Sequence, residues 1–340
     1  MAIADALFRC GFPYIKTLGM RRVTSGVVDV ATGLDNLVYV LLRADIPIGG
    51  CCVRVLNWDD EDLGSIGSTG TGDGNFQWPT KLLVDKNQNL IIADEGLNRI
   101  TTMSKEGSFI SKWGEYGCEP GQLNRPSGMA FDKDENILVV DSFNQRIQKF
   151  SKKGECLSVW GEYGSDEGYF NHPWGIAVRD DGHIFVSDWG NDRIQHFTED
   201  GIFVKQFGNS VDSESTLNKP AGIAVDSDGD VYIADRKNNR VVIFDAQGRY
   251  VQKLLGDSQL MGMARQYVRT NPVVLRLREM TRLDEQKLFR FPVSVTFDSE
   301  NKLWVGDYGS HRVQVYQKDA ERLELEELEP PRNSPKLVIN

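Results

Sequence analysis

Two sets of residues recur at regular positions in the sequence and could carry chemistry. Each member of the first set follows a proline, and each member of the second set follows an aspartate. The first set is Thr80, Ser127, Trp174, Ala221 and Val293, and the second is Glu95, Ser142, Trp189, Arg236 and Tyr308. Aromatic side chains combined with a few charges suit a small-ligand pocket or the hot spot of a protein interface. An ordinary, varied loop surface is the alternative interpretation.

Six residues from these sets and their surroundings are the candidate binding residues. They are Trp174, Trp189, Arg236, Tyr308 and Glu95, together with His172, which immediately precedes Pro173. The expected ligand is a protein, a peptide or a small molecule, and no catalytic residue is assigned. The competing hypothesis is an enzyme in which Tyr308, Arg236 and His172 converge on one point and act as a metal-free acid and base.

Neither the histidines nor the acidic runs predict a metal site or a cofactor. The four histidines are His172, His183, His196 and His311. His183 falls in a predicted hairpin turn and His196 in a predicted strand, so a three-histidine zinc site is not expected. The run Asp226–Asp230 reads DSDGD, but an EF-hand loop starting there would have Val231 and Lys237 where glycine and glutamate are needed. We interpret this run as a hairpin turn.

Composition narrows the class of protein. The chain has 340 residues and 39 Lys and Arg against 49 Asp and Glu, a net charge of −10. Acidity argues against a protein whose main task is binding phosphate backbones, so RNA is a possible but disfavoured partner, although Arg236 lies near two tryptophans in the pattern. No apolar stretch approaches the roughly 18 residues of a membrane span. The start of the chain lacks the features of a secretory signal, and the five cysteines form no Cys-x-x-Cys pair. We therefore expect a soluble, cytoplasmic protein with reduced thiols and no membrane partner.

A repeat of 47 residues positions these candidates. Proline recurs at this spacing at 79, 126, 173 and 220, aspartate at 94, 141, 188 and 235, and arginine at 99, 146, 193 and 240. A further unit with Pro292, Asp307 and Arg312 follows Pro220 after 72 residues, which indicates an insertion of 25 residues between two units. Because the aspartate and arginine recur in nearly every unit, we predict a structural role for them.

Each unit reads as four short strands. In the unit over 219–256, runs rich in Val, Ile, Tyr and Phe cover 222–225, 231–234, 240–244 and 250–255, and turns rich in Gly, Asp and Asn separate them. Repetition of such units at 40–50 residues is the signature of β-propeller blades. A degenerate unit over 26–67 precedes the others. The last unit has three strands, and Tyr14–Gly19 resembles the outer strand 250–256, so we expect an N-terminal strand to close the ring and remove its open edges.

The motifs within the units resemble those of the NHL-repeat proteins. The Pro-x-Gly start, the Val-Tyr-Ile-Ala-Asp strand and the Asn-x-Arg sequence at 144–146 and 191–193 carry this resemblance, which covers roughly residues 14 to 317. It implies a six-bladed propeller, a fold that hosts enzymes, sensors and adaptors. The family includes peptidylglycine amidating lyases, whose metal histidines follow the first proline of several blades. Here none of the five residues after those prolines is histidine.

Two segments depart from the bare repeat. Residues 257–290 contain seven Arg or Lys and four Asp or Glu, with apolar residues at helical spacing from 273 to 289 and a plausible helix start at Asn271-Pro272. We expect a helical insertion over the face that carries the candidate residues, either as a lid, as a partner surface or as packed decoration. Residues 318–340 are acidic and contain prolines, which predicts a flexible tail.

The sequence thus predicts an all-β, six-bladed propeller of four-stranded antiparallel blades, forming one domain over 1–317. The expected blades cover 26–67, 78–114, 125–161, 172–208, 219–256 and 291–317, the last completed by 12–19. The predicted function is non-catalytic recognition or scaffolding at the loop face around the central channel, because a rigid ring preorganises its loops. The alternatives are a lyase or hydrolase, metal-independent or metal-assisted, that uses the same mouth, and an RNA-binding propeller.

Overall fold

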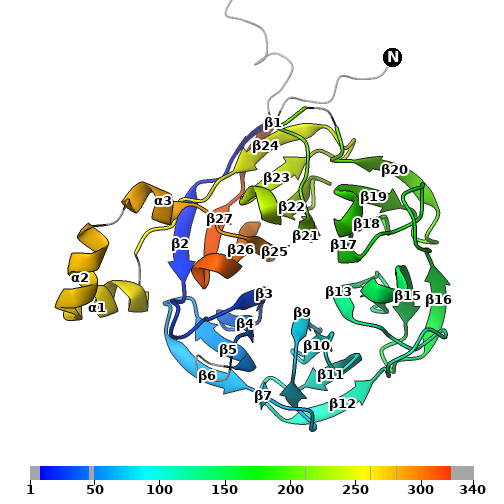
Figure 1. The fold of residues 1–340 in the computed structure, drawn as a ribbon, viewed down its shortest axis with the longest axis horizontal. Helices are drawn as coiled ribbons and strands as arrows, with labels where there is room; N and C mark the ends of the chain where they lie inside the picture. The colour runs from blue at the N-terminus through cyan, green and yellow to red at the C-terminus, as the bar shows by residue number, and fades with distance from the viewer. Residues whose placement is uncertain (1–7, 46–49, 211, 261, 281, 323–340) are drawn as a thin grey trace, which may run out of the picture.

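The computed structural model describes residues 8–45, 50–210, 212–260, 262–280 and 282–322. Six four-stranded antiparallel sheets surround a central axis as the blades of a propeller, as Figure 1 shows. This arrangement confirms the predicted fold class. We number the blades in the chain order of their innermost strands.

The first three blades follow one another without interruption. Blade 1 contains β3 (Val27–Thr32), β4 (Leu37–Arg43), β5 (Cys51–Asn57) and β6 (Asp62–Ile66). Blade 2 contains β9 (Pro79–Val84), β10 (Leu90–Asp94), β11 (Arg99–Met103) and β12 (Phe109–Trp113). Blade 3 contains β13 (Pro126–Phe131), β14 (Ile137–Asp141), β15 (Arg146–Phe150) and β16 (Cys156–Trp160). The short parallel pair β7 (Ser68–Thr69) and β8 (Asn75–Phe76) links blades 1 and 2.

The remaining blades repeat this order until the ring closes. Blade 4 contains β17 (Pro173–Val178), β18 (Ile184–Asp188), β19 (Arg193–Phe197) and β20 (Phe203–Phe207). Blade 5 contains β21 (Pro220–Val225), β22 (Val231–Asp235), β23 (Arg240–Phe244) and β24 (Tyr250–Leu254). Blade 6 contains β25 (Pro292–Phe297), β26 (Lys302–Asp307) and β27 (Arg312–Gln317), and its outer strand is β2 (Tyr14–Leu18). The pairing of β2 with β27 closes the ring as expected.

The core lies between neighbouring blades. The second strand of each of blades 2 to 5 is buried along its whole length, which explains why these strands read as continuous apolar runs rather than alternating ones. Between blades 3 and 4, for example, Val140 packs in one cluster with Ile176 and Phe197. Both faces of a middle strand are therefore covered by the adjacent blades.

The repeated aspartate and arginine have the structural role that their recurrence suggests. In blade 4 the buried carboxylate of Asp188 accepts hydrogen bonds from the Asn171 amide at 2.8 Å and from Arg193 Nε at 2.7 Å. The Arg193 guanidinium also donates to the carbonyl oxygens of Ser165, Asp166 and Tyr169 in the preceding inter-blade loop. Equivalent pairs join aspartate and arginine in blades 3, 5 and 6. These bonds tie the middle of each of these four blades to the loop that enters it.

The insertion between β24 and β25 forms three helices. They are α1 (Gly262–Thr270), α2 (Pro272–Glu279) and α3 (Leu283–Lys287), and the Asn271 side chain caps α2 as expected. Figure 1 shows these helices outside the ring, beyond β2, rather than over the central channel. The expected position over the loop face is therefore wrong. The physical reason is that β24 is the outer strand of its blade, so the chain leaves the ring at its edge.

Both ends of the described chain meet beside blade 5. The strand β1 (Phe8–Gly11) pairs with β28 (Asp319–Arg322), and Figure 1 places β1 near β24. Just before β28, the buried Lys318 ammonium contacts the carboxylates of Asp226, Asp228 and Asp230 in the β21–β22 turn. The acidic turn is thus a hairpin turn whose negative charge is reduced by one lysine of the chain itself. The predicted tail begins with β28, and 323–340 lie outside the described residues.

Candidate functional site

The mouth is the face on which the first strand of each blade begins and the second strand ends. After the second strand, blades 3 to 6 carry short 3-10 turns: η2 (Ser142–Asn144), η3 (Trp189–Asn191), η4 (Arg236–Asn238) and η5 (Tyr308–Ser310). Each turn ends in a residue with left-handed backbone, for example Asp192 with a φ of 55°. These turns place Trp189, Arg236 and Tyr308 at the rim of the central channel.

A second left-handed residue precedes the first proline of four blades. These residues are Arg125, His172, Lys219 and Phe291, with φ between 50° and 55°. The backbone amide of each donates a hydrogen bond to a side-chain oxygen of the residue that ends the turn in the previous blade. The Lys219 amide, for example, donates to Asp192 at 2.7 Å. Left-handed backbone is uncommon for residues other than glycine and persists where the surroundings enforce it. The rim is therefore held in place by bonds that link each blade to the next from blade 2 to blade 6.

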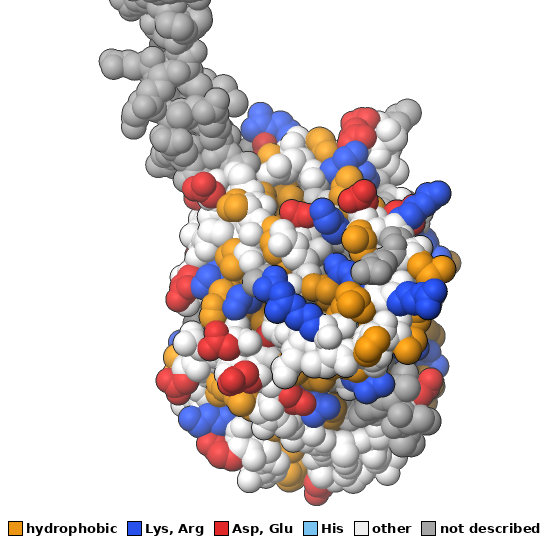
Figure 2. Space-filling model, turned by 90° about the vertical axis from the view of Figure 1, so that its left-hand side faces the viewer, with side chains coloured by type: hydrophobic (Ala, Val, Ile, Leu, Met, Phe, Trp, Pro, Cys, Tyr) orange, Lys and Arg blue, Asp and Glu red, His pale blue; other side chains and the backbone are white. Residues whose placement is uncertain are grey.

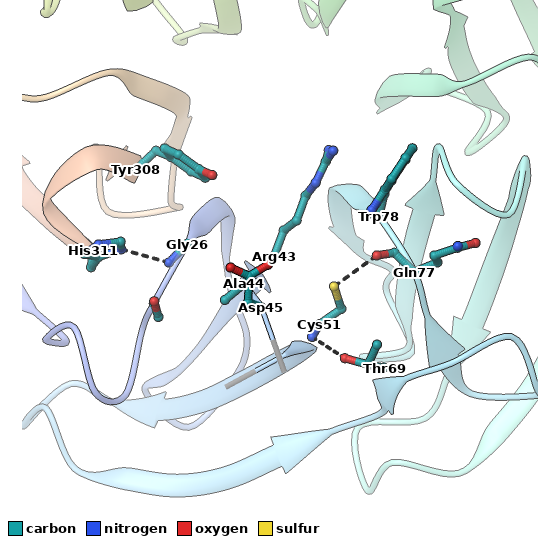
Figure 3. A pocket seen from close by; sticks show the side chains of 11 residues that line it. Gly26, Arg43, Ala44, Asp45, Cys51, Thr69, Gln77, Trp78, Tyr308 and His311 are labelled. Atoms are coloured by element: carbon teal, nitrogen blue, oxygen red, sulfur yellow. Dashed lines mark hydrogen bonds between the residues drawn. The ribbon is translucent and has the colours of Figure 1, made fainter. Parts of the chain in front are cut away.

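A cavity of about 390 Å³ opens at the mouth between blades 6, 1 and 2. Its lining includes Ser25, Arg43, Trp78, Tyr308 and His311. Figure 3 shows Arg43 between the rings of Tyr308 and Trp78. The Arg43 guanidinium lies 5.3 Å from the centre of the Trp78 ring and forms an ion pair with Glu95 at 2.8 Å. The cavity thus combines two aromatic walls with one cation that is already paired.

Arg236 supplies a second cation next to this cavity. Its guanidinium lies 5.8 Å from the centre of the Tyr308 ring. Its Nε is buried and has no hydrogen-bond partner among the described residues. Burial lowers the pKa of this guanidinium, and the positive charge of Arg43 adds to the effect. An uncompensated N–H on a partly buried cation is a strong binding element for an anion.

The opposite arc of the rim alternates cations with aromatic rings. The Arg125 guanidinium lies 4.5 Å from the centre of the Phe143 ring, and Phe143 meets His172 edge to face at 5.1 Å. The Lys219 ammonium lies 4.9 Å from the centre of the Trp189 ring. Cation–π contacts of this kind hold long basic side chains in place at the surface.

The structure brings only some of the predicted site residues together. Arg236 and Tyr308 are in contact, and Glu95 joins them indirectly through Arg43. Trp189 packs with Lys219, and His172 bonds its neighbour Asn171. Trp174 lines the narrow central channel, whose free volume is about 20 Å³. Among the described residues, no hydrogen bond, ion pair or ring contact joins His172 to Arg236 or Tyr308.

Several residues at the mouth are missing from the sequence prediction. They are Arg43, Trp78, Arg125, Phe143 and Lys219. A signal for three of them exists, because the position before the first proline of each unit holds Trp78, Arg125, His172, Lys219 and Phe291 in the same register. The residue after the proline lines the central channel instead, as Thr80, Ser127, Trp174 and Val293 do. Arg43 lies in the degenerate first unit, where no register identifies it.

The described residues contain no group of three or more His, Cys, Asp or Glu side chains that could hold a metal ion. Within the same residues, none of the helices has the length and apolar character needed to cross a membrane.

The repeat identifies the family. The model for the NHL repeat matches residues 123–150, 170–197, 217–244 and 289–316, which fall in blades 3 to 6. The chain is an NHL-repeat propeller. Blades 1 and 2 of this NHL propeller lie outside the matched residues. In blade 2, Arg99 donates to the carbonyls of Thr71, Gly72 and Asn75, and no ion pair with Asp94 is formed among the described residues.

Solved structures share the fold of this NHL propeller at low sequence identity. Streptogramin B lyase is 14% identical with a TM-score of 0.56, covering 93% of this chain and 89% of its own. A catalytically inactive virginiamycin B lyase from Staphylococcus aureus, solved with quinupristin, is 12% identical with a TM-score of 0.55 over 94% of this chain and 90% of its own. A Bacteroides thetaiotaomicron protein of unknown function is 19% identical with a TM-score of 0.63 over 92% of this chain and 77% of its own. No curated protein sequence matches the chain significantly.

Proposed function

We propose that this NHL propeller is a non-catalytic recognition module. Its mouth binds a protein, peptide or small molecule by contacting a negatively charged group of that ligand. The observation that carries this proposal is the buried Nε of Arg236, which has no hydrogen-bond partner among the described residues. Leaving such a donor unpaired costs free energy, and an incoming carboxylate or phosphate would remove that cost. The ligand would therefore complete the hydrogen bonding of the rim.

The neighbours of Arg236 define the rest of the ligand. Arg43 is neutralised by Glu95, whose side chain is largely buried, so Arg236 is the one of the two arginines beside this cavity that is left for an external anion. The rings of Tyr308 and Trp78 border the adjacent cavity of about 390 Å³, which is within the range of small-ligand sites. We expect a ligand with an anionic group attached to a flat or apolar part. Of the other candidate residues, Glu95 would act through its ion pair with Arg43, and Trp174, Trp189 and His172 would contact only a ligand that extends beyond this cavity.

The arrangement of titratable groups favours recognition over catalysis. An acid–base mechanism needs its groups within hydrogen-bond reach of one reacting atom. His172 is engaged with Asn171 and Phe143, whereas Tyr308 and Arg236 form a separate pair. The lyases of similar fold are too distant in sequence to transfer their activity to this chain. A lyase or hydrolase at the same mouth remains the alternative hypothesis.

Single-stranded RNA is the second candidate ligand, and one observation favours it. The rim alternates Arg125 with Phe143 and Lys219 with Trp189, which is the pattern that stacks bases and contacts phosphates. The net charge of −10 opposes this interpretation. A fluorescein-labelled oligouridine 20-mer tests it directly, because binding that weakens steeply with salt would support RNA.

Native mass spectrometry of the protein isolated from its own cells tests the proposal. The wild type should retain a bound molecule, and Arg236→Ala should lose it while the melting temperature stays unchanged. Lys237→Ala is the matched control, because Lys237 is the exposed next residue of the same turn. Equal retention by Arg236→Ala and wild type would contradict the proposal, as would turnover of the bound molecule into a product.

A further inference from the structure

A second, larger cavity lies between the helical insertion and blade 6. Its volume is about 700 Å³. Six basic residues line it, and its lining includes no Asp or Glu among the described residues; the basic residues are Arg21, Arg265, Arg269, Arg278, Lys287 and Arg312. Figure 2 faces this side of the molecule and shows basic side chains interspersed with hydrophobic ones. We name this cavity the basic cleft.

The walls of the basic cleft are fixed to the ring. The buried Asp60 of blade 1 accepts hydrogen bonds from the amides of Gly19 at 2.7 Å and Met263 at 3.0 Å, so one carboxylate joins β2 to α1. The Thr17 and Ser258 hydroxyls bond at 2.8 Å within the protein. The cleft is thus a built feature of the fold and not a chance gap beside a loose arm.

The charge of the basic cleft contrasts with that of the whole chain. Among the lining residues, Arg312 is paired with Asp307 of the ring at 2.8 Å, and Arg265 donates to the carbonyl of Leu260. The exposed Arg21 and Arg269 add positive charge at the same place. A chain with a net charge of −10 therefore keeps a concentrated positive field at one edge. Such a field attracts anionic groups and raises the rate of their association.

The cleft also offers exposed apolar surface. Leu275 and Leu283 line it and are 40% and 43% exposed. Val273, Leu277 and Met280 on the same arm are more exposed still. A free inorganic anion would leave these side chains in water. A matching occupant therefore carries both acidic and apolar side chains.

The sequence of this chain contains such a segment. Residues 323–329 read LELEELE, with leucines at 323, 325 and 328 and glutamates at 324, 326, 327 and 329. We propose that the basic cleft binds residues 323–329 of a second copy of this chain, with the glutamates paired to the arginines and the leucines packed on the apolar wall. The interaction is heterologous, so it joins copies head to tail.

The position of β28 favours a second copy over the same copy. Arg322 pairs with Phe8, which lies nine residues before Thr17 at the edge of the cleft. Because β28 is antiparallel to β1, it runs back from Gly11 toward Phe8 and ends at Arg322 pointing away from Thr17. To reach the cleft of its own copy, the acidic segment would have to turn and run back along β1. The acidic segment of a neighbouring copy has no such constraint.

Sedimentation equilibrium of the full chain at increasing concentration tests the proposal. The wild type should associate, and its association should weaken at least tenfold in 0.5 M NaCl and in the variant Arg269→Glu. A full chain with Glu324, Glu326, Glu327 and Glu329 all changed to Gln should behave in the same way. Arg282→Glu is the matched control, because Arg282 is on the same arm but outside the cleft, paired with Glu285.

A synthetic peptide of residues 319–331 separates the possible outcomes. It should bind the four-Gln chain and should bind the same chain carrying Arg269→Glu at least tenfold more weakly. Failure of the peptide to bind would overturn the proposal. If the peptide binds but the wild type stays monomeric, the cleft binds residues 323–329 of the same copy. That result would overturn the proposal that the segment comes from a second copy. Loss of folding in Arg269→Glu is monitored by its melting temperature, and Arg21→Glu then replaces it.

Discussion

The guanidinium of Arg43 in blade 1 and the carboxylate of Glu95 in blade 2 form an ion pair at 2.8 Å across the boundary between the two blades. Glu95 is 7% exposed, so this carboxylate is removed from water and satisfied by the neighbouring blade. The pair neutralises one of the two arginines beside the mouth cavity. Of the two, Arg236 is the arginine whose Nε has no hydrogen-bond partner among the described residues, and we propose that the selectivity of the mouth depends on this division of roles.

Glu95→Gln should free Arg43 and change both stability and binding. Loss of a charged hydrogen bond at a nearly buried site should lower the free energy of unfolding by about 1–3 kcal/mol. The ligand of the mouth should be held more tightly, since a second arginine becomes available. Urea unfolding and native mass spectrometry measure the two effects. The control Glu106→Gln changes an exposed residue of the same blade and should alter neither the free energy of unfolding nor ligand retention. Identical behaviour of the two variants would refute the assigned role of Glu95.

Asp188→Asn should be strongly destabilising. The carboxylate is fully buried and accepts from Arg193, which is itself 3% exposed, so the substitution leaves a buried guanidinium without its anion. Breaking a buried pair by removing one partner costs about 3–5 kcal/mol. Thermal unfolding should show a large fall in melting temperature, against almost none for the exposed neighbour Asp180→Asn. A small effect at Asp188 would mean that the repeated pair does not stabilise the blades.

The His183–His196 pair should make the protein sensitive to mild acid. His183 Nδ1 and His196 Nε2 lie 2.7 Å apart, and burial, with the charge of His183, lowers the pKa of His196 from 6.5 to about 4. Between pH 6.5 and about pH 4, His196 therefore binds a proton in the unfolded chain but not in the folded chain. Stability should be fully present above pH 6.5 and should fall as the pH drops toward 4.

His196→Gln should flatten that part of the pH profile. The comparison is the difference in free energy of unfolding between pH 7 and pH 5, measured by urea titration. His172→Gln serves as the control and should retain the wild-type slope. An unchanged slope in His196→Gln would show that another group controls the acid sensitivity.

Lys318→Met should loosen the attachment of β28 to blade 5. The buried ammonium contacts three aspartates of the β21–β22 turn, and its removal leaves these carboxylates close together without this cation. We expect a loss of about 3–5 kcal/mol at pH 7. The loss should shrink at pH 4, because burial raises the pKa of Asp230 and a proton can then neutralise this carboxylate. A pH-independent loss, or one equal to that of Lys237→Met, would contradict this account.

The fold could be predicted from the sequence because its determinants are local and repeated. The 47-residue spacing of proline, aspartate and arginine marks the start of the first strand, the end of the second and the start of the third. Closure by β2 could be predicted because Tyr14–Gly19 resembles the outer strand of another blade. The position of the insertion could not, because a helical period shows that a helix forms but not on which side of the ring it lies.

The site could be predicted only in part, for a similar reason. Arg236 and Tyr308 follow a repeated aspartate, so their place on the rim follows from the repeat. Arg43 comes from a unit that has lost the repeat, and its partner Glu95 is 52 residues away. Whether a side chain at the rim is already paired depends on such contacts between blades. The unmade hydrogen bond of Arg236 is therefore visible only in three dimensions.

A crystal structure of the protein purified from its own cells would test the central claim most directly. The account predicts electron density for an anionic group within hydrogen-bond distance of Arg236 Nε, with the rest of the ligand between Tyr308 and Trp78. An occupied mouth with Arg236 Nε still unpaired, or a mouth that holds no ligand at all, would contradict it.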